Sequence, residues 1–368
     1  MTRLQELHTA HGQSPWLDNL TRDYFRNGKL ENLIGEGIRG VTANPTTFAH
    51  AITGTDAYDT QLAALLSADP TIEAAYWQLV IDDTEDALNL FRPVHQASDC
   101  TDGFVSLEIA PELAADTVAT INSVRDVQRW IDRPNLMVKI PATDAGIPAI
   151  QAMTAEGHNI NITLIFSLGR YEQVIEAYLT GLESLLKSGG DISQVHSVAS
   201  FFVSRVDTEV DRRLEAVGTD QALSLRGLAA IAQAKLAYQL FRTRFASERW
   251  ERLRAVGARP QRPLWASTST KSPNYPDTMY VDELIGPDTV TTLTETTIAA
   301  FNDHGTLTQT IDQYPDRAAR SLHQIAELGI DMHEVTAVLE RQGIERFRTD
   351  QMTAFDALHH KASAIAVH

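Results

Sequence analysis

Lys139 is the residue of this 368-residue sequence whose type and position most clearly suggest chemistry. It lies within the run LMVKI (136–140), which is short, apolar and typical of a buried strand. A lysine side chain is almost never fully buried unless it has a charged partner or a chemical task. The run therefore predicts either an ion pair or a reactive amine inside the protein.

Other polar side chains alternate with apolar ones in similar segments. Successive side chains of a strand point to opposite faces, so Glu108, Asn161, Thr163 and Asn44 each lie on the polar face of their own segment. A single polar residue at a strand end is more often a satisfied hydrogen-bonding group than a catalyst, and Asn-Pro is an ordinary turn starter. Together with Lys139, however, these residues are hard to explain by packing, because their burial requires a complete hydrogen-bond network.

A buried lysine suggests one chemistry in particular. An amine taken out of water loses its proton more easily, and the neutral amine attacks a ketone to form a Schiff base. The protonated imine withdraws electrons, so that an adjacent carbon–carbon bond can break. This reaction needs an acid/base near the amine, for which Glu108 is suitably placed, and a second base for a substrate hydroxyl, for which Asp18 in WLDNL (16–20) is a candidate.

The elements that must position these residues alternate along the chain. Eight strand candidates occur in order, at 16–20, 38–43, 104–109, 135–140, 160–166, 196–200, 263–268 and 279–284. Helices are predicted between most of them, for example at 146–157 and 226–245. This alternation predicts an α/β fold with a parallel sheet, and the strand count favours a closed (β/α)8 barrel of the TIM type over an open doubly wound sheet. In such a barrel the polar faces point inward, and the chemistry lies at the C-terminal ends of the strands.

We expect one domain over residues 1–368. Residues 1–14 are predicted to form a short leading helix. Residues 311–368 are predicted to form two or three amphipathic helices, a C-terminal extension packed on the barrel, because no linker rich in Pro, Gly or Ser precedes them.

Several apparent motifs are set aside. The stretch GEGIRG (35–40) matches the dinucleotide pattern G-x-G-x-x-G, but that pattern must follow a strand and open a helix, and here the predicted order is reversed. The twelve histidines have no metal-ligand spacing, and His359 and His360 are expected on the surface of a tail helix. Cys100 is expected to be an incidental loop thiol. We therefore predict no bound metal.

Composition excludes other classes of function. The formal net charge of −17 argues against non-specific nucleic-acid binding, although a few local cations can still dominate one pocket for an anionic substrate. No apolar run is long enough for a transmembrane helix, and the first residues lack an apolar signal core. Cys100 is the single cysteine, which excludes an intrachain disulfide and fits a reducing, cytoplasmic location.

A set of segments resembles the transaldolase family, in its longer bacterial form of about this length. They are QSPWLDNLTRDYF, GIRGVTANPTTF, NLMVKIPAT, INITLIFSLGRY, SVASFFVSRVDTEVD, LWASTSTKSPNY and, in the tail, QGIERFRTDQMTAFDAL. Each is weak alone, but the set spans nearly the whole chain in order. The resemblance implies a barrel like that of the class I aldolases and no cofactor.

The resemblance also implies roles for individual residues. Lys139 matches the Schiff-base lysine, and Asp18 the aspartate that acts on the hydroxyl beside the cleaved bond. Glu108 matches the glutamate that shuttles protons through a water, and Thr163 the threonine that holds this water. The remaining matches concern substrate binding: Asn44 and Asn161 for hydroxyls and the bound intermediate, Ser200 and Arg205 for the phosphate site, and Phe202 for the aromatic residue beside it.

The sequence departs from the family pattern near the expected phosphate site. Phe201 and Ser204 replace a proline and a glycine, and WASTSTKSP (265–273) has no arginine in register. Lys271 is the candidate for the second phosphate contact, where it contributes a point charge instead of an arginine fork. Ordinary solvated surface charge is the alternative interpretation of both Arg205 and Lys271.

The resemblance implies a transaldolase of the non-oxidative pentose phosphate pathway. It would move a dihydroxyacetone unit from sedoheptulose 7-phosphate or fructose 6-phosphate to glyceraldehyde 3-phosphate or erythrose 4-phosphate. Two alternatives stay open: an aldolase that releases the three-carbon unit, and a catalytically silent barrel that binds sugar phosphates. The expected partners are sugar phosphates, with no nucleic acid or membrane, in a monomer or homodimer.

Overall fold

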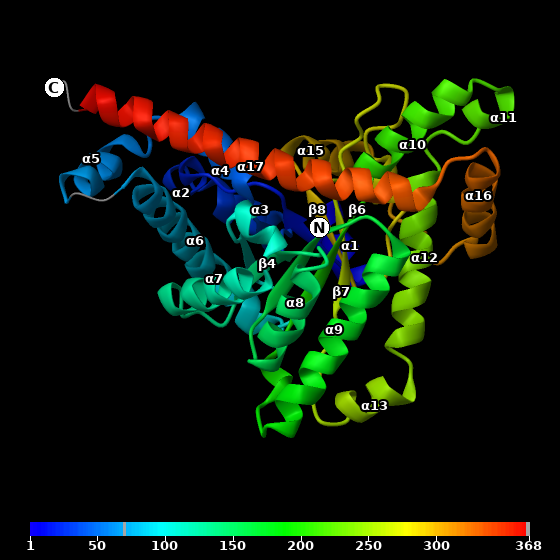
Figure 1. Cartoon of the computed structure of the whole chain (residues 1–368), viewed down its shortest axis with the longest axis horizontal. Coiled ribbons are helices and arrows are strands. Elements are labelled where there is room, and N and C mark those ends of the chain that lie inside the picture. Colours follow the sequence, from blue (N-terminus) through cyan, green and yellow to red (C-terminus); the bar gives the residue numbers. More distant parts are fainter. Residues whose placement is uncertain (69–70, 366–368) are drawn as a thin grey trace.

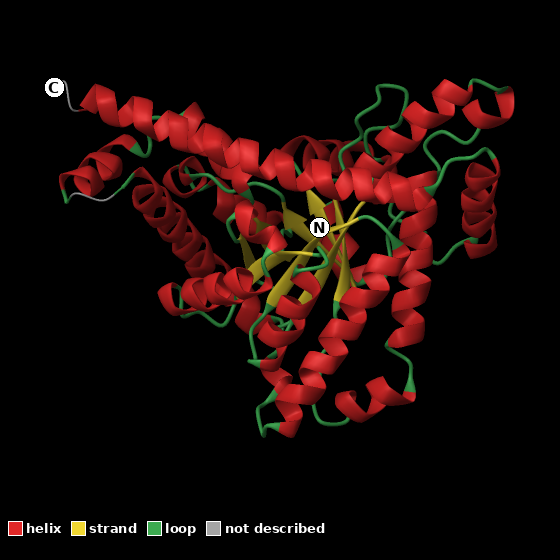
Figure 2. Ribbon diagram, in the orientation of Figure 1, coloured by secondary structure: helices red, strands yellow, loops and turns green. Residues whose placement is uncertain are grey.

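The computed structural model describes residues 1–68 and 71–365. In this part of the chain, eight parallel strands follow one another in sequence order and close into a barrel with helices around it (Figures 1 and 2). The strands are β1 (Gln13–Leu17), β2 (Gly40–Thr42), β3 (Val105–Glu108), β4 (Leu136–Pro141), β5 (Ile160–Ile165), β6 (Ser197–Phe202), β7 (Arg262–Ala266) and β8 (Thr289–Leu293). The predicted (β/α)8 barrel is confirmed.

Helices occupy the connections between the strands. Those before β6 are α1 (Arg3–His11), α2 (Arg22–Arg26), α3 (Lys29–Glu36), α4 (Pro45–Gly54), α5 (Asp59–Ser67), α6 (Ile72–Ala97), the 3₁₀ helix η1 (Pro111–Ala115), α7 (Thr117–Trp130), α8 (Gly146–Ala155), α9 (Leu168–Lys187) and η2 (Ile192–Gln194). Those after β6 are α10 (Ser204–Val217), α11 (Asp220–Leu223), α12 (Ala229–Arg244), α13 (Glu248–Arg254), α14 (Met279–Asp282), α15 (Glu295–His304), α16 (Pro315–Glu327) and α17 (Met332–Ile365). The helices predicted at 146–157 and 226–245 correspond to α8 and α12.

The register between strands determines which polar side chains become neighbours. Glu108 on β3 pairs with Lys139 on β4, and Lys139 pairs in turn with Asn161 on β5. The alternate residues Val138 and Ile140 of β4 are fully buried and point away from the barrel interior. The predicted separation into a polar inward face and an apolar outward face is therefore present on β4.

The eighth strand was predicted in the wrong place. Residues 279–284 contain α14, and the strand that closes the barrel is β8, a few residues later. The apolar residues Tyr280, Val281, Leu284 and Ile285 are all buried, and their spacing is that of one helix face rather than of a strand. At the other end of the barrel sequence, β1 lies earlier than the predicted 16–20, so that Asp18 directly follows the strand.

Within the described residues the chain ends in two helices, α16 and α17, and the sequence predicted two or three over 311–368. Helix α17 crosses above the C-terminal ends of the strands (Figure 1) and contacts α4, α10 and η1. Thr46 on α4 donates a hydrogen bond to Asp350 on α17, and Lys361 Nζ lies 2.9 Å from the carbonyl oxygen of Thr55. Residues 366–368 of that prediction lie outside the described residues.

The stretch GEGIRG (35–40) is structural. It includes the end of α3, a left-handed residue at Gly37 (φ 118°) and the first residue of β2. A Cβ atom at Gly40 would lie 2.6 Å from the Trp16 ring, so only glycine fits where β2 crosses this side chain. The helix precedes the strand, as the sequence predicted, and the order is opposite to that of a dinucleotide site.

A buried charge cluster holds the N-terminal end of the barrel. Asp102 is 1% exposed and accepts hydrogen bonds from Ser14 Oγ (2.9 Å) and Arg262 Nη2 (3.1 Å), while Arg39 Nε lies 3.4 Å away. These groups come from the regions where β1, β2, β3 and β7 begin. The cluster therefore ties the start of these strands together, far from their C-terminal ends.

Two further findings concern classes considered from the sequence. No helix in the described residues has both the length and the apolar character needed to span a membrane. Residues 1–68 and 71–365 also contain no group of three or more His, Cys, Asp or Glu side chains arranged to hold a metal ion.

Candidate active site

A cavity of about 950 Å³ lies at the C-terminal ends of the strands, where the sequence predicted the chemistry. Eight of the predicted site residues line it: Asp18, Asn44, Lys139, Thr163, Ser200, Phe202, Arg205 and Lys271. The other two, Glu108 and Asn161, are buried directly behind this lining, at the register positions on either side of Lys139. The structure thus brings the predicted residues of seven strands or strand ends to one place.

Lys139 and Glu108 form a buried ion pair. Lys139 Nζ lies 3.1 Å from Glu108 Oε2, and the two residues are 5% and 4% exposed. Burial raises the pKa of the Glu108 carboxyl above its usual range, although the Lys139 charge acts in the opposite direction. A carboxyl group whose pKa is raised holds its proton more readily than a free one, which suits it to acid/base work beside an amine.

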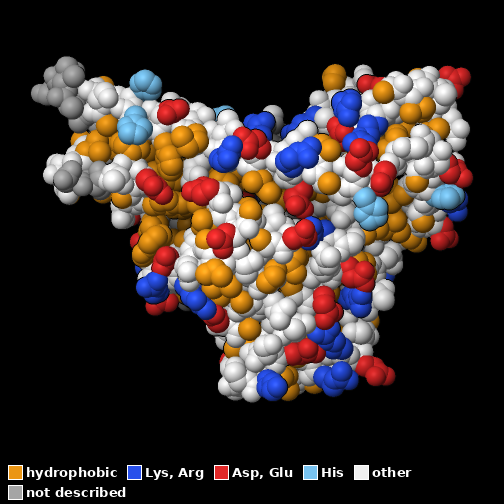
Figure 3. Space-filling view, viewed as in Figure 1, with side chains coloured by type: hydrophobic (Ala, Val, Ile, Leu, Met, Phe, Trp, Pro, Cys, Tyr) orange, Lys and Arg blue, Asp and Glu red, His pale blue; other side chains and the backbone are white. Residues whose placement is uncertain are grey.

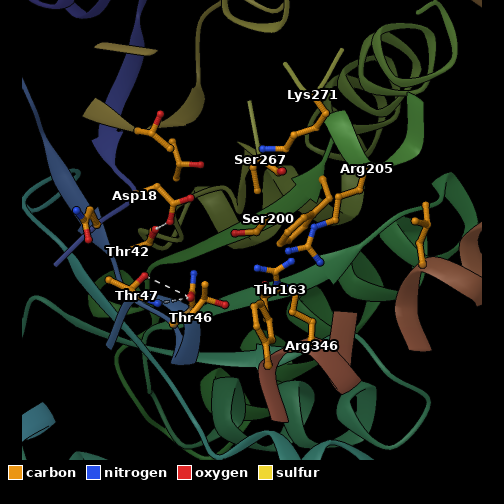
Figure 4. A pocket seen from close by; sticks show the side chains of 18 of the residues that line it. Asp18, Thr42, Thr46, Thr47, Thr163, Ser200, Arg205, Ser267, Lys271 and Arg346 are labelled. Atoms are coloured by element: carbon orange, nitrogen blue, oxygen red, sulfur yellow. Dashed lines mark hydrogen bonds between the residues drawn. The ribbon is translucent and has the colours of Figure 1, made fainter. Parts of the chain in front are cut away.

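Asp18 faces the same cavity from the end of β1. Its Oδ1 accepts a hydrogen bond from Thr42 Oγ1 at 2.9 Å (Figure 4), and its backbone N–H donates to the carbonyl oxygen of Leu293 at 2.9 Å. These bonds fix both its backbone and one carboxylate oxygen. The other oxygen, Oδ2, makes no hydrogen bond within the described residues and is available to a molecule in the cavity.

A chain of hydrogen bonds fixes Asn161 inside the barrel. Its Nδ2 donates to Ser106 Oγ at 3.0 Å, and its Oδ1 accepts from Ser200 Oγ at 2.7 Å. Asn161 is fully buried and uses its amide on both sides, so its orientation is set without a ligand. Ser200 lines the cavity with its hydroxyl already donated to Asn161.

Thr163 is an unsatisfied polar group of the site. Its Oγ1 is buried and makes no hydrogen bond within the described residues. The next residue, Leu164, has a left-handed backbone (φ 57°), and the pairing of β5 with β6 shifts register at this point. Such bulges re-aim side chains next to functional sites, and a buried hydroxyl without a partner is unusual elsewhere.

Asn44 has a structural task as well as a place in the cavity lining. It is the N-cap of α4, where Oδ1 accepts from the backbone N–H of Thr47 at 3.0 Å. The Asn-Pro turn expected from the sequence is therefore present, with Pro45 in the first helical turn. The cap uses Oδ1 only, so the amide nitrogen remains for a ligand.

The opposite side of the cavity is cationic. Arg205, in the first turn of α10, stacks on the Phe202 ring with its Cζ atom 5.2 Å from the ring centroid. Lys271, on the loop after β7, points toward the same part of the cavity (Figure 4). Burial lowers the pKa of both groups, and each is also lowered by neighbouring positive charge. The negative net charge of the chain thus coexists with a local positive site, and Lys and Arg side chains also gather along the upper edge of the molecule (Figure 3).

Two groups at this end were missed in the sequence. Arg346 and Phe347 of α17 line the cavity, and Phe347 lies on Arg205 with 6.0 Å between its ring centroid and Cζ. The sequence signal was limited to the tail segment QGIERFRTDQMTAFDAL, which resembles the family without indicating where the helix docks.

Comparisons with known proteins identify the family of this chain. A sequence model of the family described as Transaldolase/Fructose-6-phosphate aldolase matches residues 15–358. The chain is 48% identical over 346 residues to a protein of Thermobifida fusca (strain YX) named Transaldolase, with 94% of each chain covered. It is 47% identical over 360 residues to the Transaldolase of Parafrankia sp. (strain EAN1pec), covering 97% of this chain and 98% of the relative. A Transaldolase of Mycolicibacterium smegmatis is 46% identical over 351 residues, or 95% of each chain. The chain therefore belongs to the transaldolase/fructose-6-phosphate aldolase family.

Proposed function

We propose that this chain acts as a transaldolase, with Lys139 as the amine that carries the transferred three-carbon unit. The observation that carries the assignment is the position of Lys139, which lines the cavity, is 5% exposed and places its Nζ 3.1 Å from the carboxyl group of Glu108. An amine in this position can exchange its proton with Glu108 without contact with bulk water. The neutral amine is the form that attacks a ketone.

The first step joins the amine to the C2 carbonyl of a ketose phosphate. Nζ adds to the carbon, a proton moves to the oxygen, and the carbinolamine loses water to give a protonated imine. Glu108 supplies and takes up the protons of these two stages. Thr163 Oγ1, buried and without a hydrogen bond in the described residues, supports a role in holding the water through which Glu108 acts.

The second step breaks the bond between C3 and C4. Asp18 removes the proton of the C4 hydroxyl, the C3–C4 electron pair moves into the imine, and an aldehyde leaves while an enamine remains on Lys139. The imine is the electron sink, so the proposed reaction requires no metal or organic cofactor. The free Oδ2 of Asp18 supports its role as this base.

The third step reverses the second with a different aldehyde. The enamine carbon attacks the acceptor carbonyl, Asp18 returns the proton to the new hydroxyl, and water hydrolyses the imine to release the product ketose. Between the two halves the three-carbon unit must be kept from hydrolysis and protonation. Asn161, held rigidly by two serine hydroxyls, and the free amide nitrogen of Asn44 are proposed to bind its hydroxyl groups.

The cationic end of the cavity supports phosphorylated substrates. Arg205 and Lys271 are proposed to bind the phosphate of a donor, sedoheptulose 7-phosphate or fructose 6-phosphate, and of an acceptor, erythrose 4-phosphate or glyceraldehyde 3-phosphate. Phe202 holds the Arg205 guanidinium by stacking. The chain would act in the non-oxidative pentose phosphate pathway, and its single cysteine, Cys100, supports a cytoplasmic location.

Borohydride trapping tests the assignment. Reduction in the presence of fructose 6-phosphate is expected to add a three-carbon unit to Lys139, detected by peptide mass spectrometry. The Lys139→Met variant is expected to remain folded with no turnover and no label. Label at another lysine in the wild-type protein would refute the role of Lys139.

One further assay separates the transaldolase from a fructose-6-phosphate aldolase, the other activity in the family description. Dihydroxyacetone release from fructose 6-phosphate is measured with and without erythrose 4-phosphate. Sedoheptulose 7-phosphate formed in the presence of the acceptor, with little dihydroxyacetone released in its absence, is the expected result. Substantial dihydroxyacetone release that does not depend on the acceptor, with no sedoheptulose 7-phosphate formed, contradicts the transaldolase assignment.

A further inference from the structure

Three cations from separate elements meet at one end of the cavity. Arg205 comes from α10, Lys271 from the loop after β7 and Arg346 from α17, and all three line the cavity. In Figure 4 the three side chains lie to the right of Asp18 and Thr42. Arg205 and Lys271 lie a few residues after β6 and β7, whereas Arg346 lies on the last helix, far from any strand in the sequence.

These positive charges are only weakly neutralised by the protein. Arg205 and Lys271 make no salt bridge or side-chain hydrogen bond within the described residues. Arg346 contacts Asp350 through Nε at 3.3 Å, which leaves both of its terminal nitrogens without a hydrogen bond in the described part of the chain. Asp350 is also the acceptor for Thr46 Oγ1, so its charge is shared.

Asp18, Glu108 and Asp350 attract Arg205 only through space and make no ion pair with it in the described residues. Glu209, which also lines the cavity, is already bonded to Arg212 and Arg213 at 2.7–2.9 Å. Next to burial, Arg346 is the strongest influence that lowers the pKa of Arg205. Like charges placed together without a counter-ion destabilise one another, and an anion bound between them removes this cost.

The packing of α17 fixes the position of Arg346. The neighbouring Phe347 is buried with its ring against Arg205, whose other aromatic neighbour is Phe202. One turn earlier, a Cβ atom at Gly343 would lie 2.9 Å from Leu164 Cδ2 and 3.7 Å from Arg205 Nη1. This close approach places α17 directly on the barrel, beside Leu164 and the phosphate-binding candidate Arg205.

We propose that Arg346 binds the substrate phosphate together with Arg205 and Lys271, so that α17 completes the phosphate site. The proposal rests on the proposed function for the identity of the phosphate ester. Two guanidinium groups on one phosphate provide the planar, bidentate hydrogen bonding that a lysine ammonium cannot. Arg346 is therefore a specificity-determining residue that selects phosphorylated over unphosphorylated sugars.

The chain offers a matched control on the same helix. Arg346 and Arg348 have side chains that are 59% and 60% exposed, and Arg348 is paired with Glu345 at 3.1 Å and does not line the cavity. Arg346→Met and Arg348→Met are compared as full-length proteins, with Arg346→Lys as the variant that keeps the charge. Steady-state rates are measured with erythrose 4-phosphate and with erythrose as acceptors, at saturating fructose 6-phosphate.

For Arg346→Met, the KM for erythrose 4-phosphate is expected to rise about 10- to 100-fold, the effect of losing a charge-assisted hydrogen bond. The kcat/KM for erythrose should change little, Arg346→Lys should recover part of the loss, and Arg348→Met should behave as wild type. An unchanged KM for erythrose 4-phosphate, or an equal loss with erythrose, would overturn the proposal.

Calorimetric titration with inorganic phosphate makes the result independent of turnover. The wild-type protein should bind phosphate at least about 10-fold more tightly than Arg346→Met, while Arg348→Met should match the wild type. Failure of borohydride labelling at Lys139 would refute the proposed function and leave this binding result valid. Equal phosphate affinity in wild type and Arg346→Met would refute the role of Arg346 and leave the Schiff-base assignment intact.

Discussion

Replacing Lys139 with methionine tests the electrostatics of the site separately from its chemistry. The substitution keeps a long apolar side chain but removes the charge that lies 3.1 Å from Glu108 Oε2. Glu108 then remains buried, at 4% exposure, without a cation in contact. The variant therefore measures the free-energy cost of keeping Glu108 buried as a carboxylate without its cation.

The magnitude follows from the state of Glu108. Removing one partner of a buried ion pair costs about 3–5 kcal/mol if the other partner stays charged. Burial already raises the pKa of Glu108 while Lys139 opposes the increase, so in the variant this pKa must rise further. A carboxyl group whose pKa is raised in the folded protein binds its proton more tightly in the folded than in the unfolded state. The free energy of unfolding therefore falls as pH rises. Between the wild-type and variant pKa values of Glu108, the loss relative to wild type should grow by about 1.4 kcal/mol per pH unit.

Urea unfolding at about pH 5.5 and about pH 8 measures this dependence. Lys139→Met should be closer to wild type at the lower pH, where Glu108 is more often neutral. The double variant Lys139→Met/Glu108→Gln should remove the pH-dependent part of the loss, because it has no titrating group in the pair. The same loss at both pH values, or a double variant no more stable than the single one at about pH 8, would refute the reasoning.

Other groups give sharper tests of single roles. Thr163→Val should lower kcat about 10- to 100-fold with a smaller change in KM for fructose 6-phosphate, because the proposed water loses a hydrogen bond; an unchanged kcat excludes that role. Asp18→Asn should lower kcat about 10²- to 10⁴-fold while the Schiff base on Lys139 still forms and can be trapped. Asp102→Ala should lower the free energy of unfolding by about 3–5 kcal/mol in urea and leave the kcat of the folded protein unchanged, since the cluster lies at the opposite end of the barrel. Burial raises the pKa of Asp207 to about 7, so the stability of the wild type relative to Asp207→Asn should fall between about pH 5 and about pH 7, and parallel stability curves would contradict this.

The sequence predicted the strands in which polar and apolar residues alternate between the two faces, as they do in β4. The error at β8 has a physical cause. β8 has the sequence TVTTL, in which Thr289, Thr291 and Thr292 are buried. Thr289 Oγ1 donates to the carbonyl oxygen of Gly286, and Thr292 Oγ1 to that of Trp265, so these hydroxyls are buried at little cost. A hydrophobicity pattern cannot detect a strand in which buried threonines stand where apolar residues are expected.

The candidate site was predictable to the extent that it follows from the barrel. Once parallel strands are assigned, their register places Glu108, Lys139 and Asn161 side by side. Arg346 could not be placed in this way, because its position depends on where α17 docks. That docking is set by contacts distant in sequence, such as the one between Gly343 and Leu164.

In the barrel interior, polar groups that stabilise the fold lie beside the groups proposed to react, and their hydrogen bonds explain how both can be present. Polar groups there satisfy one another: Asn161 bonds to two serines, and Thr42 bonds to Asp18. Burying them costs little as long as these networks stay complete. Among the groups of the proposed mechanism, the Thr163 hydroxyl and the second oxygen of Asp18 make no hydrogen bond within the described residues, and the Lys139 amine contacts only Glu108 and, at 3.5 Å, the Ala43 carbonyl oxygen. These are the atoms that the proposed transfer needs, so the network stabilises the site and leaves the reacting groups available to substrate.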